Sequence, residues 1–171
     1  MSKTQKIKTK RVPLKYVPKR LTKKDKVRVR RELKKSRRAY KKGKYYTRKR
    51  VSSFKSRVSK HILKARRVYR VDDIVPSKEL AKKTGCSVDA LEKIERKGMG
   101  AYYSSGSRPN QTAHSWGRAR LASAITGGKS SAIDFSILEK GCRKNGTAYK
   151  LAKKARRVHK KGTRRVPQTK L

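Results

Sequence analysis

The uneven distribution of positive charge is the feature that most limits how this chain can fold. The 171 residues include 54 Lys and Arg but only 10 Asp and Glu, a net charge of +44. Residues 1–70 carry 31 basic and 2 acidic side chains, residues 71–150 carry 14 and 8, and residues 151–171 carry 9 and none. Because like charges repel, the middle segment is best suited to fold without a neutralising partner. We therefore predict a compact centre between two basic arms.

The composition predicts a mainly α fold, with a small helical core and long basic arms that are partly extended. Apolar residues make up 33% of the chain, below the roughly 45–50% of a typical domain, so the core must be small. No stretch alternates apolar and polar residues as a half-buried strand does. We predict a basic extended arm over 1–20, a basic helical region over 21–70, a compact helical core over 71–146, and a basic C-terminal helix and tail over 147–171.

The first segment is expected to order only on a partner. Pro13 and Pro18 stand among Lys and Arg, and the few aliphatic residues cannot bury enough surface to offset the entropy of ordering. The available anchors are Val12, Leu14, Tyr16 and Val17.

Capping residues and glycines predict most of the helices. Helices are expected over 23–42, 78–83, 88–97, 113–125, 131–140 and 148–161. Apolar residues at helical spacing from Phe54 to Tyr69 predict a further basic helix after a Ser-rich start. Residues 79–94 look like a helix-turn-helix, but acidic residues at 89, 92 and 95 would repel phosphates where such a motif reads DNA. We favour a helical hairpin that completes a core.

No residues form a recognisable catalytic or metal-binding pattern. Cys86 and Cys142 belong to no CxxC or Cys/His cluster, so we expect reduced, structural thiols in a reducing compartment. His114 and Ser115 are neighbours, but neighbours on a helix do not face each other. We therefore predict a protein that is not an enzyme and has no cofactor or metal. No run approaches the roughly 20 apolar residues that cross a bilayer, which predicts a protein that is not transmembrane.

The stretch from Gly98 to Gly128 is the long segment in which Lys and Arg stop dominating, and it holds the only Trp. A solvated basic tail has no need for aromatic residues in a fixed order, so we predict a folded protein-docking surface here. Its predicted docking residues are Tyr102, Tyr103, Arg108, Pro109 and Trp116.

Two short runs are candidates for phosphate contact. Hydroxyls, a flexible backbone and a guanidinium come together between Ser104 and Arg108, although Ser side chains in such a loop often satisfy their own backbone instead. Aromatic and cationic residues interleave between Lys44 and Arg50, which suits phosphate contact with base stacking, a protein surface, or a solvated turn. The predicted anion contacts are Ser104, Ser105, Ser107, Arg108, Tyr45, Tyr46, Arg48, Lys49 and Arg50.

Two motifs carry a resemblance to a known domain. They are SRRAYKKGKYYTRKR, which begins at Ser36, and AYYSSGSRPNQT, which begins at Ala101 and is followed by SWG and TGGK. They resemble a small conserved domain of unknown function in proteins of nucleocytoplasmic large DNA viruses, including algal and giant viruses, and of some large phages. The resemblance covers roughly residues 30–141. It implies a viral origin and supplies no activity.

Two functions follow as hypotheses. The first is a minor capsid protein inside the virion, which would bind capsid proteins through its core and reach viral DNA or inner-membrane headgroups with its arms. The alternative is a sequence-independent protein that binds and condenses DNA. We rank the capsid role first because charge alone does not explain the ordered aromatic and glycine pattern. A ribosomal protein would match the charge, but the resemblance does not favour it.

Overall fold

The computed structural model describes residues 10–160 and 166–171, and over these residues the chain is mainly helical, as predicted. The predictions for residues 1–9 and 161–165 lie outside the described residues. In chain order the elements are β1 (Arg11–Pro13), a 3-10 turn η1 (Leu14–Tyr16), α1 (Lys23–Lys41), α2 (Lys60–Tyr69), α3 (Lys78–Thr84), α4 (Val88–Ser104), α5 (Ala113–Ile125), α6 (Lys129–Ile133), α7 (Phe135–Gly141), α8 (Thr147–His159) and β2 (Gln168–Lys170).

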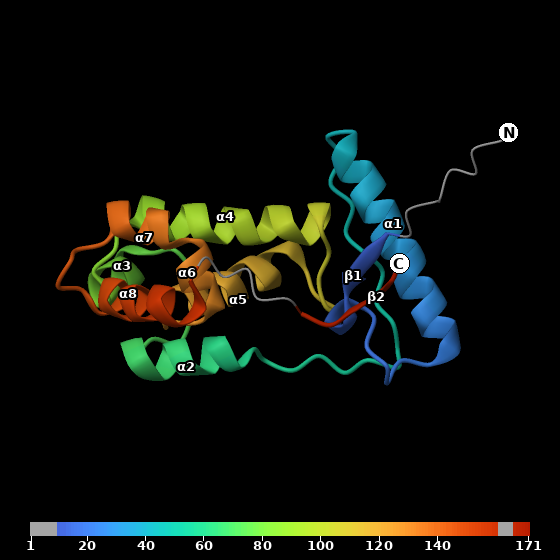
Figure 1. The fold of residues 1–171 in the computed structure, drawn as a ribbon, viewed down its shortest axis with the longest axis horizontal. Coiled ribbons are helices and arrows are strands. Elements are labelled where there is room, and N and C mark those ends of the chain that lie inside the picture. The colour runs from blue at the N-terminus through green and yellow to red at the C-terminus, as the bar shows by residue number, and fades with distance from the viewer. Residues whose placement is uncertain (1–9, 161–165) are drawn as a thin grey trace, which may run out of the picture.

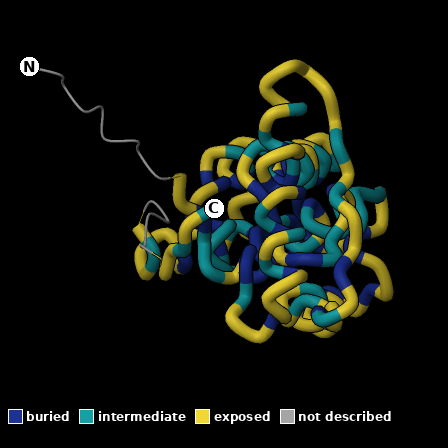
Figure 2. Tube along the Cα trace, turned by 90° about the vertical axis from the view of Figure 1, so that its right-hand side faces the viewer, coloured by how far each residue is buried: buried dark blue, intermediate teal, exposed yellow. Residues whose placement is uncertain are grey.

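Two apolar clusters organise these elements into two lobes (Figure 1). The helical lobe surrounds the larger cluster and contains α2, α3, α6, α7, α8 and parts of α4 and α5; its most buried side chains include Leu80, Leu91, Ile94, Leu121 and Leu138. The α1 lobe surrounds the smaller cluster and contains β1, η1, α1, the coil that follows α1, and β2. Its buried residues are Val12, Tyr16, Val17, Leu21, Val29, Leu33, Val51 and Phe54. Buried positions run through the interior, whereas turns and outer helix faces are exposed (Figure 2).

Several helices match their sequence signals. Thr22 caps α1 by accepting a hydrogen bond from the Asp25 amide, and the chain turns at Gly43 with a φ of 69°. Thr112 caps α5 in a reciprocal capping box with Ser115. The helix-turn-helix-like segment forms α3 and the start of α4 and contributes Leu80, Leu91 and Ile94 to the core. Local signals therefore suffice where capping and burial agree.

The end predicted for α4 is wrong, because Gly98 does not stop the helix. Helix α4 continues to Ser104, and Gly98 faces Gly117 of α5. A Cβ added at Gly98 would lie 2.6 Å from the Gly117 Cα atom, and one added at Gly117 would lie 2.7 Å from the Glu95 carbonyl oxygen. Both glycines thus serve the close crossing of α4 and α5 rather than a helix end.

The helix expected from about Phe54 begins only at Lys60, and residues 42–59 form a coil that packs on α1 and α4. The amide of Asn110 donates to the carbonyls of Val51 and Phe54, at 2.9 and 2.6 Å, and its oxygen accepts from the Val51 amide at 2.8 Å. These bonds satisfy the backbone of the coil from a distant loop, so the helix is not needed.

Three of the four N-terminal anchors pack against their own chain. Val12, Tyr16 and Val17 are buried in the α1 lobe. Strand β1 pairs antiparallel with β2, with Val12 opposite Thr169, although no alternation predicted either strand. A three-residue strand is too short to display a pattern, and its partner lies at the other end of the sequence.

The prediction of free thiols is also wrong, since Cys86 and Cys142 form a disulfide. The two residues face each other across an isolated antiparallel bridge, in which the Ser87 amide donates to Gly141 and the Arg143 amide donates to Gly85. The bond joins the α3–α4 turn to the end of α7. Nothing in the local spacing of the cysteines signals this pairing, because it is set by the tertiary fold.

Candidate nucleic-acid interface

The central motif forms an internal support centred on Arg48. Tyr102 is fully buried, and the Arg48 guanidinium stacks on its ring at 3.7 Å from the ring centroid. Arg48 donates through Nη1 to Ser36 Oγ (2.9 Å) and the Tyr102 carbonyl (2.7 Å), and through Nη2 to Ser107 Oγ (2.7 Å). The Tyr102 hydroxyl accepts from the Arg48 amide. These contacts fasten the coil after α1 to the end of α4.

Several predicted site residues are thereby removed from the surface. Tyr102, Ser107 and Pro109 are buried, so they present nothing to a docking partner or an anion. Arg48 already has neutral hydrogen-bond partners and a ring, and its guanidinium is held inward. Part of the pattern of aromatic and Ser residues in this stretch is therefore a requirement of folding, which the sequence does not distinguish from a requirement of docking.

The other docking candidates lie in two separate places. Tyr103 is half-buried between the rings of Tyr102 and Tyr45, each with its centroid 5.0 Å away. Trp116 is half-buried and meets Tyr16 edge to face at 6.0 Å, on the smaller apolar cluster. The structure therefore does not gather the predicted docking residues into one surface.

The candidate phosphate contacts also separate. Arg108 and Ser105 are exposed and Ser104 is half-buried, with the two serine hydroxyls 3.4 Å apart. Lys49 and Arg50 are exposed on the coil. Tyr46 instead donates from its hydroxyl to Glu32 at 2.8 Å, and its ring lies 4.4 Å from the Lys35 ammonium.

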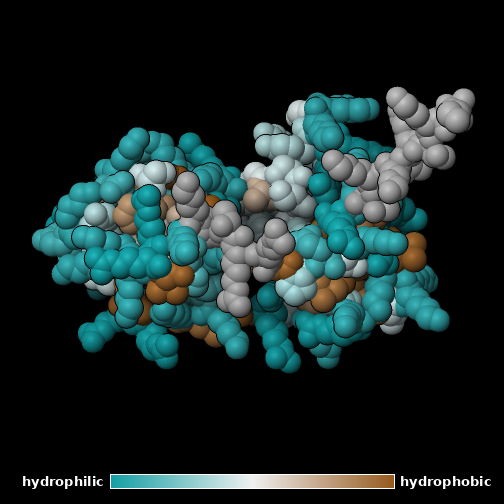
Figure 3. Space-filling model, viewed as in Figure 1, coloured by the Kyte–Doolittle hydropathy of each residue, from teal (hydrophilic) through white to brown (hydrophobic). Residues whose placement is uncertain are grey.

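A strongly cationic surface lies on α1, which sequence reasoning did not select as a site. A groove of about 760 Å³ runs along the helix, and seven of its nine lining residues are Lys or Arg. They are Arg30, Arg31, Lys34, Lys35, Arg38, Lys42 and Lys44, together with Val27 and Ala39. The sequence signal for this surface lies on the face of α1 opposite the buried Val29 and Leu33. Lys and Arg recur on that face at spacings of three and four. Hydrophilic residues likewise dominate the face shown in Figure 3, where apolar surface is limited to patches.

The two carboxylates of α1 accept their hydrogen bonds from Ser53, Tyr46 and the Lys49 amide, and not from the cations of the groove. Asp25 accepts from the hydroxyl and amide of Ser53, at 2.6 and 2.9 Å, and the Ser53 hydroxyl bond is the main cause of its lowered pKa. Glu32 accepts from Tyr46 and from the Lys49 amide. Burial raises the pKa of Glu32, but these hydrogen bonds and the charges of Lys35 and Lys49 outweigh it, so the pKa lies below its ordinary value. In the described part of the chain, neither carboxylate forms an ion pair with a cation of the groove.

A second group of cations lies where η1, α2 and the loop after α4 approach one another. Burial lowers the pKa of Lys15, and the charges of Arg108 and Lys129 lower it further. Burial likewise lowers the pKa of His61, followed by the charges of Lys64, Lys15 and Arg108. The Lys15 ammonium lies 5.6 Å from the Trp116 ring centroid. Mutual repulsion in this group would be relieved by an anion.

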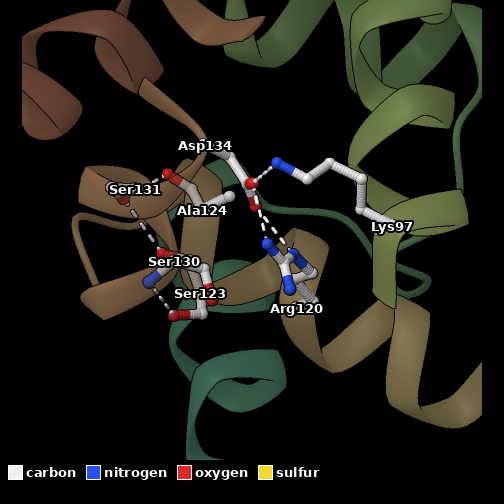
Figure 4. A network of polar contacts seen from close by, with 7 residues as sticks. All are labelled: Lys97, Arg120, Ser123, Ala124, Ser130, Ser131 and Asp134. Atoms are coloured by element: carbon white, nitrogen blue, oxygen red, sulfur yellow. Dashed lines mark hydrogen bonds and ion pairs between the residues drawn. The ribbon is translucent and has the colours of Figure 1, made fainter. Parts of the chain in front are cut away.

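By contrast, a buried carboxylate of the helical lobe binds two cations, the mostly buried Arg120 and the half-exposed Lys97 (Figure 4). The Asp134 side chain is fully buried between α6 and α7 and accepts from Arg120 in a bidentate pair, with both N–O distances 2.8 Å, and from Lys97 at 2.6 Å. Beside it, the Ser131 hydroxyl donates to the carbonyls of Ser123 and Ala124. This network joins α4 and α5 to the α6–α7 corner. The single helix predicted over 131–140 is therefore wrong, because the chain forms two short helices, α6 and α7, that are separated at Asp134.

Two other kinds of site were sought in the described residues. Over 10–160 and 166–171, no three His, Cys, Asp or Glu side chains come together in a way that could hold a metal ion. The same residues include no helix with the length and apolar character needed to cross a membrane.

The fold and the charged surfaces define a small, mainly helical and strongly basic protein with a cationic groove along one helix. Residues 13–140 match the model of a family described as a family of unknown function (DUF5824), and since this is well over half of the chain, the protein belongs to that family. Neither the search of curated proteins nor that of solved structures found a match. The matched residues include α1, the Arg48 support and the α4–α5 crossing, whereas all of α8 and all of β2 lie outside them.

Proposed function

We propose that this protein binds nucleic acid through the groove on α1, without reading base sequence. The observation that carries the proposal is the groove itself, where seven of nine lining residues are cationic and none is acidic. Phosphates along a nucleic acid are regularly spaced anions, and Lys and Arg that contact them release condensed counterions. A helix whose cations recur every turn matches such a row of charges.

The inward position of the α1 carboxylates supports the same proposal. Eleven of the 19 residues of α1 are Lys or Arg, and both of its acids bond to the protein interior. The positive charge of the helix far exceeds that of its two acids, which favours binding of an external polyanion. The residues that line the groove do not form a base-reading arrangement. They offer Lys ammonium and Arg guanidinium groups to phosphates, and they include no Asn or Gln that would pair with base edges.

A minor capsid role, with partners among capsid proteins and a location in the virion, stays a prediction from the resemblance. It was ranked first because the ordered aromatic and glycine pattern suggested a docking surface. The Arg48 support accounts for much of that pattern within the chain, since Tyr102 and Ser107 are buried. The alternative of sequence-independent binding is therefore the function that the geometry favours.

The test compares two charge-matched variants. Lys34 and Arg38 are exposed, four residues apart, in the groove, while Lys153 and Arg157 are exposed with the same spacing on α8. We expect Lys34→Gln with Arg38→Gln to weaken binding of a 20-base-pair duplex more than Lys153→Gln with Arg157→Gln does. Wild type should give a log–log salt slope of about −6 if all seven groove cations contact phosphates, and the groove variant should lose about 2 of this slope.

Two results would contradict the proposal. Equal losses in the two variants would mean that only the overall charge matters and that the groove is not the site. No measurable binding of duplex or single strand at about 50 mM salt, where phosphate contacts are strong, would reject the function itself. Two duplexes of unrelated sequence should bind within about twofold of each other.

A further inference from the structure

Beside the groove, an aromatic side chain projects into solvent from a basic surface. The Tyr45 side chain is 73% exposed, which is more than any other large apolar residue in the described chain. Tyr40 as a residue is 38% exposed, and Tyr103 is half-buried. A single exposed aromatic residue is common on protein surfaces, so Tyr45 is of interest because of the rings and the groove cations beside it.

The backbone holds Tyr45 against its neighbours. Helix α1 ends at Lys41, and the chain reverses at Gly43, whose φ of 69° favours glycine. The amides of Gly43 and Lys44 donate back to the carbonyls of Tyr40 and Ala39, at 3.0 and 2.9 Å. This turn returns Tyr45 to the end of α1, where its ring centroid lies 6.3 Å from that of Tyr40.

The rings form a continuous series from the interior to the surface. Tyr45 lies 5.0 Å from Tyr103, and Tyr103 lies 5.0 Å from Tyr102, which is itself buried under Arg48. Tyr45 is therefore exposed but held from one side by these tilted and edge-on ring contacts. A supported aromatic face loses little entropy when a second flat group stacks on it.

The charge around the rings indicates the chemistry of that group. Lys42 and Lys44 line the end of the groove and flank Tyr45 closely in the sequence. None of the ion pairs in the described residues involves positions 37–50. A ligand that combines flat aromatic groups with a row of negative charges complements this surface, and unpaired nucleic acid is such a ligand, because bases that are not in a duplex expose their faces.

We infer that Tyr45, with Tyr40 and Tyr103, is a stacking platform for an unpaired base of single-stranded nucleic acid whose phosphates follow the groove. This rests on the proposed function for the phosphate contacts and adds to it a preference for single strands. The sequence pointed to the run containing Tyr45 and Tyr46 for this role. Of these two, Tyr46 donates a hydrogen bond to Glu32 and its ring contacts the Lys35 ammonium. The proposed platform therefore contains Tyr40 and Tyr103 and does not contain Tyr46.

The test uses three ligands of equal length: a single-stranded oligonucleotide, the same strand made abasic, and a duplex. Tyr45→Ala should weaken binding of the single strand about 5- to 100-fold, as expected for loss of one base–aromatic stack. Its effect on the abasic strand and on the duplex should be less than twofold. Tyr45→Phe keeps the ring and should bind the single strand within about twofold of wild type. Because Tyr45 is exposed, unchanged thermal melting should show that both variants fold.

The outcomes separate this inference from the proposed function. If Lys34→Gln with Arg38→Gln weakens binding of all three ligands while Tyr45→Ala weakens binding of none, the groove binds phosphates and the inference of a stacking platform is wrong. If wild type binds none of the ligands, both proposals fail. An acidic peptide is measured as a fourth ligand. If Tyr45→Ala weakens binding of this peptide and leaves binding of the single strand unchanged, the rings serve a protein partner and the inference is overturned.

Discussion

The crossing of α4 and α5 allows a stability prediction with an internal control. Gly98 and Gly100 lie two residues apart in the same helix, and both can be changed to Ala by adding one methyl group. At Gly98 the new Cβ would lie 2.6 Å from the Gly117 Cα atom, about 0.8 Å short of the 3.4 Å where ordinary contact begins. At Gly100 nothing lies within 4 Å.

The two substitutions should have opposite effects on stability. Ala in place of Gly stabilises a helix interior by about 1 kcal/mol, and Gly100→Ala should show this gain. Gly98→Ala gains the same term but forces two backbones apart, at a cost near the upper end of the roughly 1–3 kcal/mol for overpacking, because a backbone has no rotamer with which to yield. The net expectation for Gly98→Ala is a loss of about 2 kcal/mol.

Thermal unfolding followed by circular dichroism at fixed salt measures the difference. For a chain of this size about 2–4 °C corresponds to 1 kcal/mol, so we expect Tm to fall by about 4–8 °C for Gly98→Ala and to rise by about 2–4 °C for Gly100→Ala. A rise of Tm in both variants would refute the close approach of the helices as the reason for Gly98.

Three further predictions concern charge, pH and redox state. Asp134→Asn should lower the free energy of unfolding in urea by about 3 kcal/mol, because it leaves cations beside a buried site; a loss below about 1 kcal/mol would contradict this. The lowered pKa of Glu32 adds stability above its unfolded pKa, and this is lost as pH falls through the folded pKa, so Glu32→Gln should lose less Tm than wild type between pH 7 and pH 3. Reduction of the Cys86–Cys142 disulfide, which spans 56 residues, should cost about 4 kcal/mol by the loop-entropy relation, measured by urea unfolding with and without reductant.

The sequence predicted those parts of the fold that depend on local interactions. The start of α1 at Thr22 and the whole of α5 follow from capping groups and helical spacing, which involve residues at most a few positions apart. The mainly α class and the apolar seam of α3 and α4 follow from the same periodicity. No tertiary information was needed for them.

The features that the sequence did not predict depend on residues far apart in the chain. Asn110 satisfies the backbone of Val51 and Phe54, so a segment with helical spacing remains a coil. Gly98 has the local properties of a helix end and is instead a contact point. In each case a distant partner outweighs a local preference that is worth about 1 kcal/mol or less.

The candidate site was predicted in part. The run from Lys44 to Arg50 adjoins the groove and contains Tyr45, but its members divide between the interior and the surface. Arg48 supports Tyr102, Tyr46 holds Glu32, and Tyr45 remains exposed. Composition alone cannot make this division, because Tyr and Arg suit both an internal stack and an external contact.

The pairing of β1 with β2 makes the distance between the two ends of the described chain a measure of folding. Arg11 lies opposite Lys170, and the Leu171 amide donates to the Lys10 carbonyl at 2.9 Å. An unfolded chain of 171 residues has a radius of gyration of about 44 Å, and its self-repulsion at low salt expands it further. Energy transfer between dyes at positions 10 and 171 would therefore change from nearly complete to nearly absent on unfolding, and would report the opening of the α1 lobe.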